Sequence, residues 1–243
     1  MSMKKMVIML ALSLGLFTSA PAMGETVVFA TGEWAPFIGE TLPEYGLHPQ
    51  IITKVFTKMG YDVKFDFMPW KRVYQLTKKG DYIATFTWSK TPERAEEMFF
   101  PKNELSLSKE VAFYKKSKFP DGLTLSGLGD IKTKKLKVVG IASYWYEKAL
   151  KDLGIKVHIV STGDLAWKML NGGRADIMIE NYDVGNAESQ AYLGQGKNAE
   201  FGITEPLKTQ QMYLVFSRVH PKAKEVMAKY DETVAAMKAA GEL

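Results

Sequence analysis

The sequence predicts an α/β fold with mostly parallel sheet strands. Three observations support this class. Residues 25–89 alternate between strand-like and helix-like segments, which is the order that parallel sheets require. Residues 49–60 carry apolar side chains at helical spacing on one face. The chain has 243 residues, of which 46% are hydrophobic, enough to bury one large core or two smaller ones.

The N-terminus predicts a secretory signal peptide over residues 1–24. Lys4 and Lys5 precede an apolar run from Met6 to Phe17, and small residues follow that run. An uncleaved membrane anchor is the alternative, but the run is short for a bilayer. Because the chain contains no cysteine, a lipoprotein anchor is excluded. We therefore expect a mature protein free in the periplasm.

The composition argues against several classes of chemistry. The formal net charge is +5, but the lysines are dispersed and lack interleaved aromatic residues, so no nucleic-acid partner is expected. His48, His158 and His220 do not have the spacing of metal ligands. The sequence contains no nucleophile elbow and no phosphate-binding loop. We therefore predict no metal site, no cofactor and no catalytic residue.

The elements follow from periodicity and from their flanking residues. Strands are expected at 25–31, 61–67, 111–115, 136–142, 155–160, 174–181 and 211–217. Helices are expected at 49–60, from Met68 to Lys79, from Ser143 to Gly154, at 164–170 and at 221–241. The segment 103–110 is polar and is expected to be extended.

Residues 81–94 are the most informative stretch. A buried strand ends in small hydroxyl residues, and a helix then starts with Thr91 as N-cap and Pro92 at its first position. Arg94 falls in the first turn, where the helix dipole disfavours a cation. It either pairs with a nearby acid (Glu93, Glu96 or Glu97) or binds a ligand carboxylate. In the second case Thr87 and Ser89 supply hydroxyl groups at the strand end.

The motif Thr87-x-Ser89-x-Thr91-Pro92-Glu93-Arg94, followed by Phe99-Phe100-Pro101, resembles the extracellular solute-binding proteins of family 3. These are periplasmic binding proteins of polar amino-acid ABC transporters. The resemblance implies a two-lobed, type II periplasmic binding protein fold, with a mostly parallel sheet and flanking helices in each lobe. The ligand is expected in the interlobe cleft. Lobe 1 would comprise residues 25–108 and 211–243, and lobe 2 residues 109–210.

The resemblance also implies ligand-binding residues in both lobes. Arg94 matches the arginine that holds a ligand α-carboxylate, and Trp34 and Trp70 match aromatic positions that wall the cleft. The alternative for Trp34 is that it only closes the edge of the core. Tyr144 and Trp145 stand where the family usually has Gly-Thr, so they are expected either to stack on a flat ligand or to pack between the lobes.

An acid that holds the ligand's α-amino group is expected at the end of the strand opened by Gly173-Arg174-x-Asp176. By residue count this position is Asn181, with Glu180 directly before it. Because side chains alternate along a strand, only one of the two is expected to face the cleft. Asn181 carries no charge, so recognition of an ammonium group depends on Glu180.

The resemblance implies that a monomer captures a small carboxylate-bearing solute by hinge closure and delivers it to an ABC permease in the inner membrane. One alternative is an enzyme on the same fold, similar to cyclohexadienyl dehydratases, with Glu33 or Glu180 as general acid. Another is the input domain of a periplasmic sensor.

Overall fold

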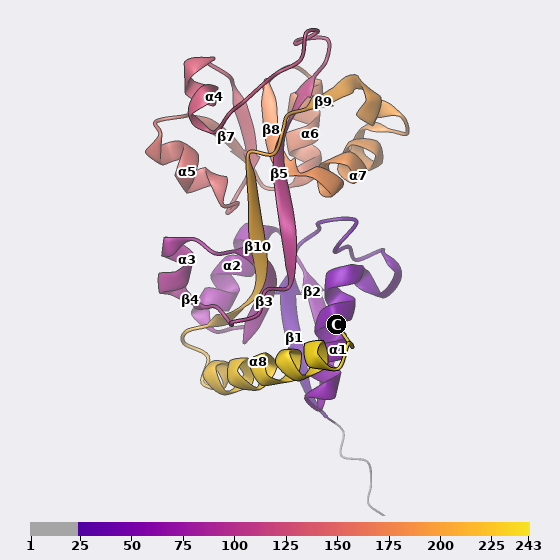
Figure 1. Cartoon of the computed structure of the whole chain (residues 1–243), viewed down its shortest axis with the longest axis vertical. Helices are drawn as coiled ribbons and strands as arrows, with labels where there is room; N and C mark the ends of the chain where they lie inside the picture. Colours follow the sequence, from indigo (N-terminus) through magenta and orange to yellow (C-terminus); the bar gives the residue numbers. More distant parts are fainter. Residues whose placement is uncertain (1–23) are drawn as a thin grey trace, which may run out of the picture.

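A computed structural model describes residues 24–243, and Figure 1 shows that they form two lobes. The predicted signal peptide lies outside the described residues, apart from Gly24. Between residues 24 and 243, none of the helices combines the length and apolar composition needed to cross a bilayer.

Lobe 1 is built on three parallel strands in the order β2-β1-β3. Its elements are β1 (Glu25–Thr31), a 3-10 turn (Pro43–Tyr45), α1 (Leu47–Lys58), β2 (Tyr61–Phe67), α2 (Trp70–Lys79), β3 (Ala84–Ser89), α3 (Pro92–Glu97), β4 (Met98–Phe99) and α8 (Ala223–Ala239). The C-terminal helix α8 returns to lobe 1 and lies beside α1 (Figure 1).

Lobe 2 repeats this plan with parallel strands in the order β8-β6-β7. Its elements are α4 (Gly129–Thr133), β6 (Val138–Ile141), α5 (Tyr146–Asp152), β7 (Val157–Val160), α6 (Gly163–Asn171), β8 (Ile177–Asn181), α7 (Tyr182–Leu193), a 3-10 turn (Lys197–Glu200) and β9 (Phe201–Ile203).

Two long antiparallel strands run through both lobes, β5 (Ser106–Lys115) and β10 (Lys208–Ser217). They pair with each other over Ser106–Glu110, and their remaining residues join the sheets of lobes 1 and 2. The expected lobe boundaries at 108/109 and 210/211 fall inside these strands. The two strands therefore form the connection through which the lobes would hinge.

Several element bounds differ from the expectation for local reasons. Strand β5 starts at Ser106, because the polar segment before Val111 continues the same strand. Helix α5 starts at Tyr146 and not at Ser143, whose φ of +71° no helical residue adopts. Helix α7 was not predicted, because Tyr182–Leu193 has only a weak apolar face.

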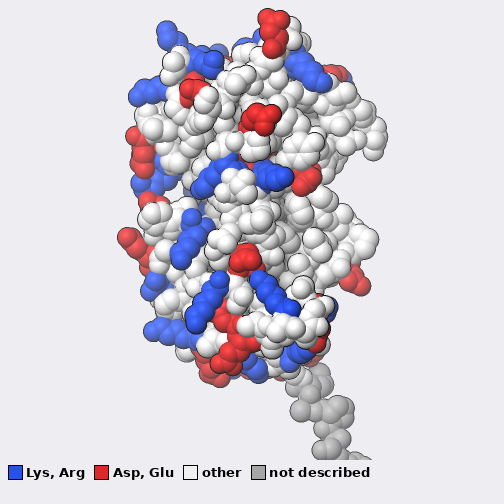
Figure 2. Space-filling model, in the orientation of Figure 1, with Lys and Arg blue, Asp and Glu red and all other residues white. Residues whose placement is uncertain are grey.

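Each lobe has its own apolar core. The lobe 1 core contains Phe29 and Phe56, whose rings meet edge to face with centroids 4.8 Å apart. Lobe 2 buries Trp167 on one side of its sheet and Tyr146 on the other. Tyr144 packs against all three clusters, so it joins the two lobes. Lys and Arg are dispersed among acids over the face in Figure 2.

Candidate ligand-binding cleft

The local sequence at Arg94 folds as predicted. Strand β3 ends at Ser89, and Thr91 caps α3 by accepting a hydrogen bond on Oγ1 from the backbone N–H of Arg94, at 3.2 Å. Pro92 occupies the first turn of the helix. This short turn carries the Arg94 side chain back toward the end of β3, where it is 9% exposed.

The guanidinium of Arg94 has no acidic partner among the described residues. Its Nη1 donates to the carbonyl oxygen and the hydroxyl of Ser89, at 2.8 and 2.7 Å. Its Nη2 donates to the carbonyl oxygen of Ser143 in lobe 2, at 2.5 Å. Burial lowers the pKa of Arg94 to about 10, so the group stays charged at neutral pH.

The alternative that Arg94 pairs with Glu93, Glu96 or Glu97 does not fit the structure, because its guanidinium donates only to Ser89 and Ser143 among the described residues. Glu93 lies 3.4 Å from Lys148, and Glu97 pairs with Lys78 at 2.5 Å. Glu97 also accepts a hydrogen bond from the hydroxyl of Tyr74, at 2.6 Å. These contacts occupy Glu93 and Glu97 and leave the guanidinium without an acidic partner.

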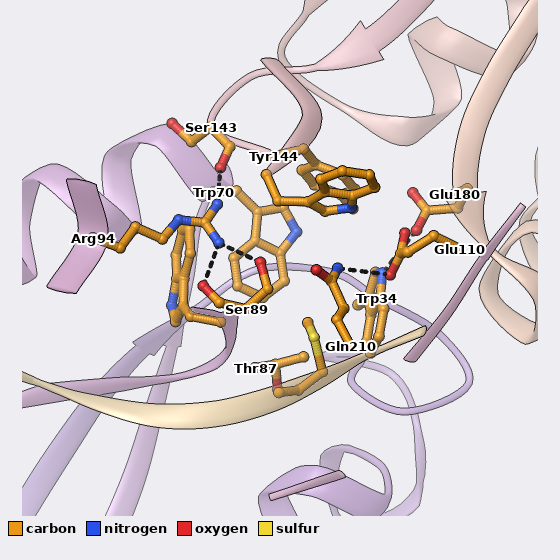
Figure 3. A pocket seen from close by; sticks show the side chains of 13 residues that line it. Trp34, Trp70, Thr87, Ser89, Arg94, Glu110, Ser143, Tyr144, Glu180 and Gln210 are labelled. Carbon is orange, nitrogen blue, oxygen red and sulfur yellow. Dashed lines mark hydrogen bonds between the residues drawn. The ribbon is translucent and has the colours of Figure 1, made fainter. Parts of the chain in front are cut away.

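A narrow cavity of about 40 Å³ lies in front of Arg94, between the lobes. Figure 3 shows Arg94 on one side of this cavity and Glu110 and Glu180 on the other, with the rings of Trp70 and Tyr144 between them. The lining residues come from both lobes and from the two connecting strands: Trp34, Trp70, Thr87, Trp88, Ser89, Arg94, Glu110, Ser143, Tyr144, Trp145, Glu180, Gln210 and Met212. We call it the Arg94 cavity.

The predicted aromatic residues line this cavity and also belong to the packed interior. Trp34 is 4% exposed and Trp70 7% exposed, and both lie in the core of lobe 1. The indole N–H of Trp34 donates to Oε1 of Glu180 at 3.1 Å, which links lobe 1 to lobe 2. Tyr144 and Trp145 line the cavity and pack against the lobe 2 core. The packing interpretation of Trp34, Tyr144 and Trp145 is therefore compatible with a place on the cavity wall, and their contact with a ligand stays a prediction.

Thr87 and Ser89 both line the cavity, as the strand-end pattern predicts. Thr87 has a φ of +69°, an uncommon conformation for a residue with a branched side chain. Its Oγ1 lies 2.9 Å from Nδ1 of His48, and burial lowers the pKa of His48 to about 4. A neutral His48 therefore orients the Thr87 hydroxyl at the cavity wall.

The two candidates at the end of β8 have different roles. Glu180 lines the cavity, whereas Asn181 is the N-cap of α7. The side-chain oxygen of Asn181 accepts from the backbone N–H groups of Asp183 and Val184, at 2.9 and 3.1 Å. The assignment of Asn181 as a ligand-binding residue does not fit this geometry, because its oxygen satisfies the first turn of a helix that the sequence pattern did not reveal.

Replacing Asn181 with alanine is expected to lower stability without removing solute binding. The change deletes a cap that two amides share, which costs about 1 kcal/mol, up to 2. Urea unfolding measures the stability loss, and titration with any solute that binds measures the affinity. Binding lost at unchanged stability would instead assign Asn181 to the ligand.

Glu110 and Gln210, which no motif in the sequence indicates, reach the cavity from the connecting strands. Gln210 donates from Nε2 to Oε1 of Glu110 at 3.1 Å, across 100 residues of sequence. One feature of the sequence could have indicated this site. Ser108 and Glu110 are two residues apart, so their polar side chains share one face of β5. Glu33, the other acid proposed from sequence, lines a separate cavity.

The acids in and near the Arg94 cavity have raised pKa values. Burial raises the pKa of Glu110. Burial, together with the nearby charges of Glu188 and Glu110, raises the pKa of Glu180 well above its usual range. Burial also raises the pKa of Glu188 to about 7. No group of three or more His, Asp or Glu side chains in residues 24–243 is placed to hold a metal ion.

Two α/β lobes that enclose a buried guanidinium define a solute-binding protein of the periplasmic type. The chain belongs to the bacterial extracellular solute-binding proteins, family 3, whose model matches residues 27–243. No curated protein sequence is similar enough to this chain to match it.

Solved structures share the fold at low sequence identity. A histidine kinase sensor domain with similarity to periplasmic binding proteins has a TM-score of 0.75 and 17% identity, over 90% of this chain and 93% of its own. An ancestral arginine-binding protein bound to arginine has a TM-score of 0.72 and 21% identity, over 90% and 95%. The substrate-binding protein of an amino-acid ABC transporter has a TM-score of 0.71 and 17% identity, over 89% and 95%.

Proposed function

We propose that this protein captures a small carboxylate-bearing solute, an amino acid or a related compound, between its two lobes. The observation that carries the proposal is the guanidinium of Arg94, which is buried in an interlobe cavity without an acidic partner. A planar guanidinium binds a carboxylate through two parallel hydrogen bonds. The residues that bind the solute would be Trp34, Trp70, Thr87, Ser89, Arg94, Tyr144, Trp145 and Glu180.

Hinge closure would complete the site. Arg94 of lobe 1 already donates to the Ser143 carbonyl of lobe 2, and Trp34 of lobe 1 donates to Glu180 of lobe 2. An arriving carboxylate would take the place of the Ser143 carbonyl on Nη2. The solute would then bridge the lobes and stabilise the closed form by its greater affinity for that form.

The proposed setting is uptake. The chain would act as a monomer in the periplasm and deliver its solute to an ABC permease in the inner membrane. Family membership supports this setting. An enzyme of the cyclohexadienyl dehydratase kind is the second candidate, because burial raises the pKa of Glu180 in the cavity, as a general acid requires.

Tryptophan fluorescence distinguishes the two candidates. Trp34, Trp70 and Trp145 line the cavity, so a solute that enters it is expected to change their emission. We suggest a titration with amino acids, their keto and cyclic analogues and aromatic acids, followed by recovery of the solute. Unchanged solute after saturation supports a binding protein. Conversion of prephenate or arogenate would establish the enzyme.

A further inference from the structure

The Arg94 cavity is too small for the solute that the proposed function requires. Its volume is about 40 Å³. A buried water molecule needs roughly 10–15 Å³, so the cavity has room for only a few waters. Pockets that bury a small molecule usually measure about 300–1,000 Å³. Part of the protein therefore occupies the space that a bound solute would need.

Residues 143–145 occupy that space. They lie between β6 and α5 in lobe 2, and we call them the 143–145 loop. The carbonyl oxygen of Ser143 accepts a hydrogen bond from Nη2 of Arg94 at 2.5 Å, across the lobe interface (Figure 3). Tyr144 follows, and it packs against the core clusters of both lobes. The loop therefore gives the guanidinium an acceptor oxygen in place of a solute carboxylate.

Tyr144 separates the Arg94 cavity from two larger cavities, each lined by residues of both lobes. One has a volume of about 320 Å³ and shares the walls Trp70 and Tyr144 with the Arg94 cavity. The other has a volume of about 410 Å³ and lies against all three residues of the 143–145 loop. Because Tyr144 lines all three cavities, a movement of its side chain would connect Arg94 to space in which a small molecule fits.

The 143–145 loop has an uncommon backbone conformation that one side chain supports. Ser143 has a φ of +71°, which residues other than glycine rarely adopt. Its N–H donates to Oε2 of Glu147 at 2.8 Å, and the N–H of Glu147 donates to the carbonyl oxygen of Tyr144 at 3.1 Å. Glu147 therefore holds the loop by one hydrogen bond in each direction. Residues in such sparsely populated conformations cluster in ligand-binding and switch segments.

We propose that Tyr144 is a gate that determines which carboxylates reach Arg94, because the 143–145 loop occupies the site until a solute displaces it. A compact carboxylate takes the place of the Ser143 carbonyl while the Tyr144 ring stays. A carboxylate with a larger body binds only after the ring has moved, which lowers its affinity. This inference rests on the proposed function and adds the size of the solute and the residue that selects it.

The test compares acetate with phenylacetate, two carboxylates that differ by one aromatic ring. Tryptophan fluorescence measures their affinity for the unaltered protein and for Tyr144→Ala. We expect the variant to bind phenylacetate at least about tenfold more tightly than the unaltered protein does, and acetate with an affinity changed by less than about threefold. A tenfold difference corresponds to a binding-competent form that makes up about a tenth of the unaltered protein.

Stopped-flow kinetics distinguishes a gate from a cavity that the substitution only enlarges. For the unaltered protein, we expect the observed rate of phenylacetate binding to reach a plateau as its concentration rises, because displacement of the loop precedes binding. Glu147→Ala removes the acceptor of the Ser143 N–H and leaves the Tyr144 ring in place. This loss of one hydrogen bond is expected to raise the plateau by about threefold or more.

Two controls accompany these variants. Glu147→Gln keeps an acceptor oxygen for the Ser143 N–H, so its plateau is expected to stay close to that of the unaltered protein. Tyr182→Ala removes an exposed tyrosine that lines none of the three cavities, and it is expected to change neither affinity nor rate. Should Tyr144→Ala not fold, the two Glu147 variants carry the test.

Three results would overturn the gate. The first is a rate of phenylacetate binding that rises linearly with concentration in the unaltered protein. The second is an unchanged affinity of Tyr144→Ala for phenylacetate, and the third is a plateau that Glu147→Ala leaves unchanged.

Arg94→Ala separates a failure of this inference from a failure of the proposed function. Acetate binding that depends on Arg94, together with phenylacetate binding that is independent of Tyr144 and Glu147, would keep the carboxylate site and reject the gate. Gated phenylacetate binding that survives Arg94→Ala would support the gate and reject Arg94 as the carboxylate site. Binding of neither probe to any variant would reject both.

Discussion

Replacing Arg94 with alanine is expected to abolish the thermal stabilisation that a bound solute gives to this protein. A solute at a hundred times its dissociation constant adds about 2.7 kcal/mol to the free energy of unfolding. For a chain of this size, that corresponds to a rise of roughly 5–11 °C in Tm. The variant loses this rise because a carboxylate without the guanidinium would be buried unpaired in the Arg94 cavity.

The empty Arg94→Ala variant should remain folded, because the cap of α3 uses the backbone N–H of Arg94 and not its side chain. Arg94→Lys keeps the charge but cannot form the bidentate hydrogen bonds of a guanidinium. We therefore expect the solute to stabilise this variant less than the unaltered protein and more than Arg94→Ala. Arg72→Ala provides the matched control, because Arg72 is an exposed arginine outside the Arg94 cavity. Full stabilisation of Arg94→Ala by the solute would contradict the clamp.

The local structure around Arg94 was predictable because its signals are local. Thr91, Pro92 and Arg94 lie within four residues, and each acts through the geometry of one helix start. The α/β class was predictable for a similar reason, since it depends on short periodic segments. The absence of a salt bridge between Arg94 and the neighbouring acids was not predictable. Glu93 and Glu97 instead pair with Lys148 and Lys78, which are distant in the sequence.

The acid end of the cavity was predicted less well, because it is assembled from distant parts of the chain. Glu110 and Gln210 meet only when β5 and β10 pair. The choice between Glu180 and Asn181 depended on where β8 ends and α7 begins, and the weak apolar face of α7 concealed that boundary. A residue count alone therefore selected the capping residue and not the cavity residue.

Replacing Glu188 with glutamine is expected to stabilise the empty protein at pH 8 and to leave its stability almost unchanged at pH 4. Burial raises the pKa of Glu188 from 4.5 to about 7. The folded state therefore binds the proton more tightly than the unfolded state does. The contribution of this group to stability is present below pH 4.5 and is lost as the pH rises to about 7.

The loss is on the order of 3 kcal/mol above pH 7, since each unit of pKa difference corresponds to about 1.4 kcal/mol. Glutamine keeps the shape of the side chain and an oxygen for the indole of Trp167 but carries no charge. We therefore expect Tm at pH 8 to rise by roughly 6–12 °C relative to the unaltered protein. Thermal unfolding at pH 4 and pH 8 measures the difference.

The exposed variant Glu200→Gln is the control, and no stabilisation at pH 8 is expected from it. An equal effect of Glu188→Gln at both pH values, or a loss of stability at pH 8, would show that the carboxyl group is satisfied within the protein. Stabilisation of Glu188→Gln at pH 8 alone would show that the charge of Glu188 opposes folding.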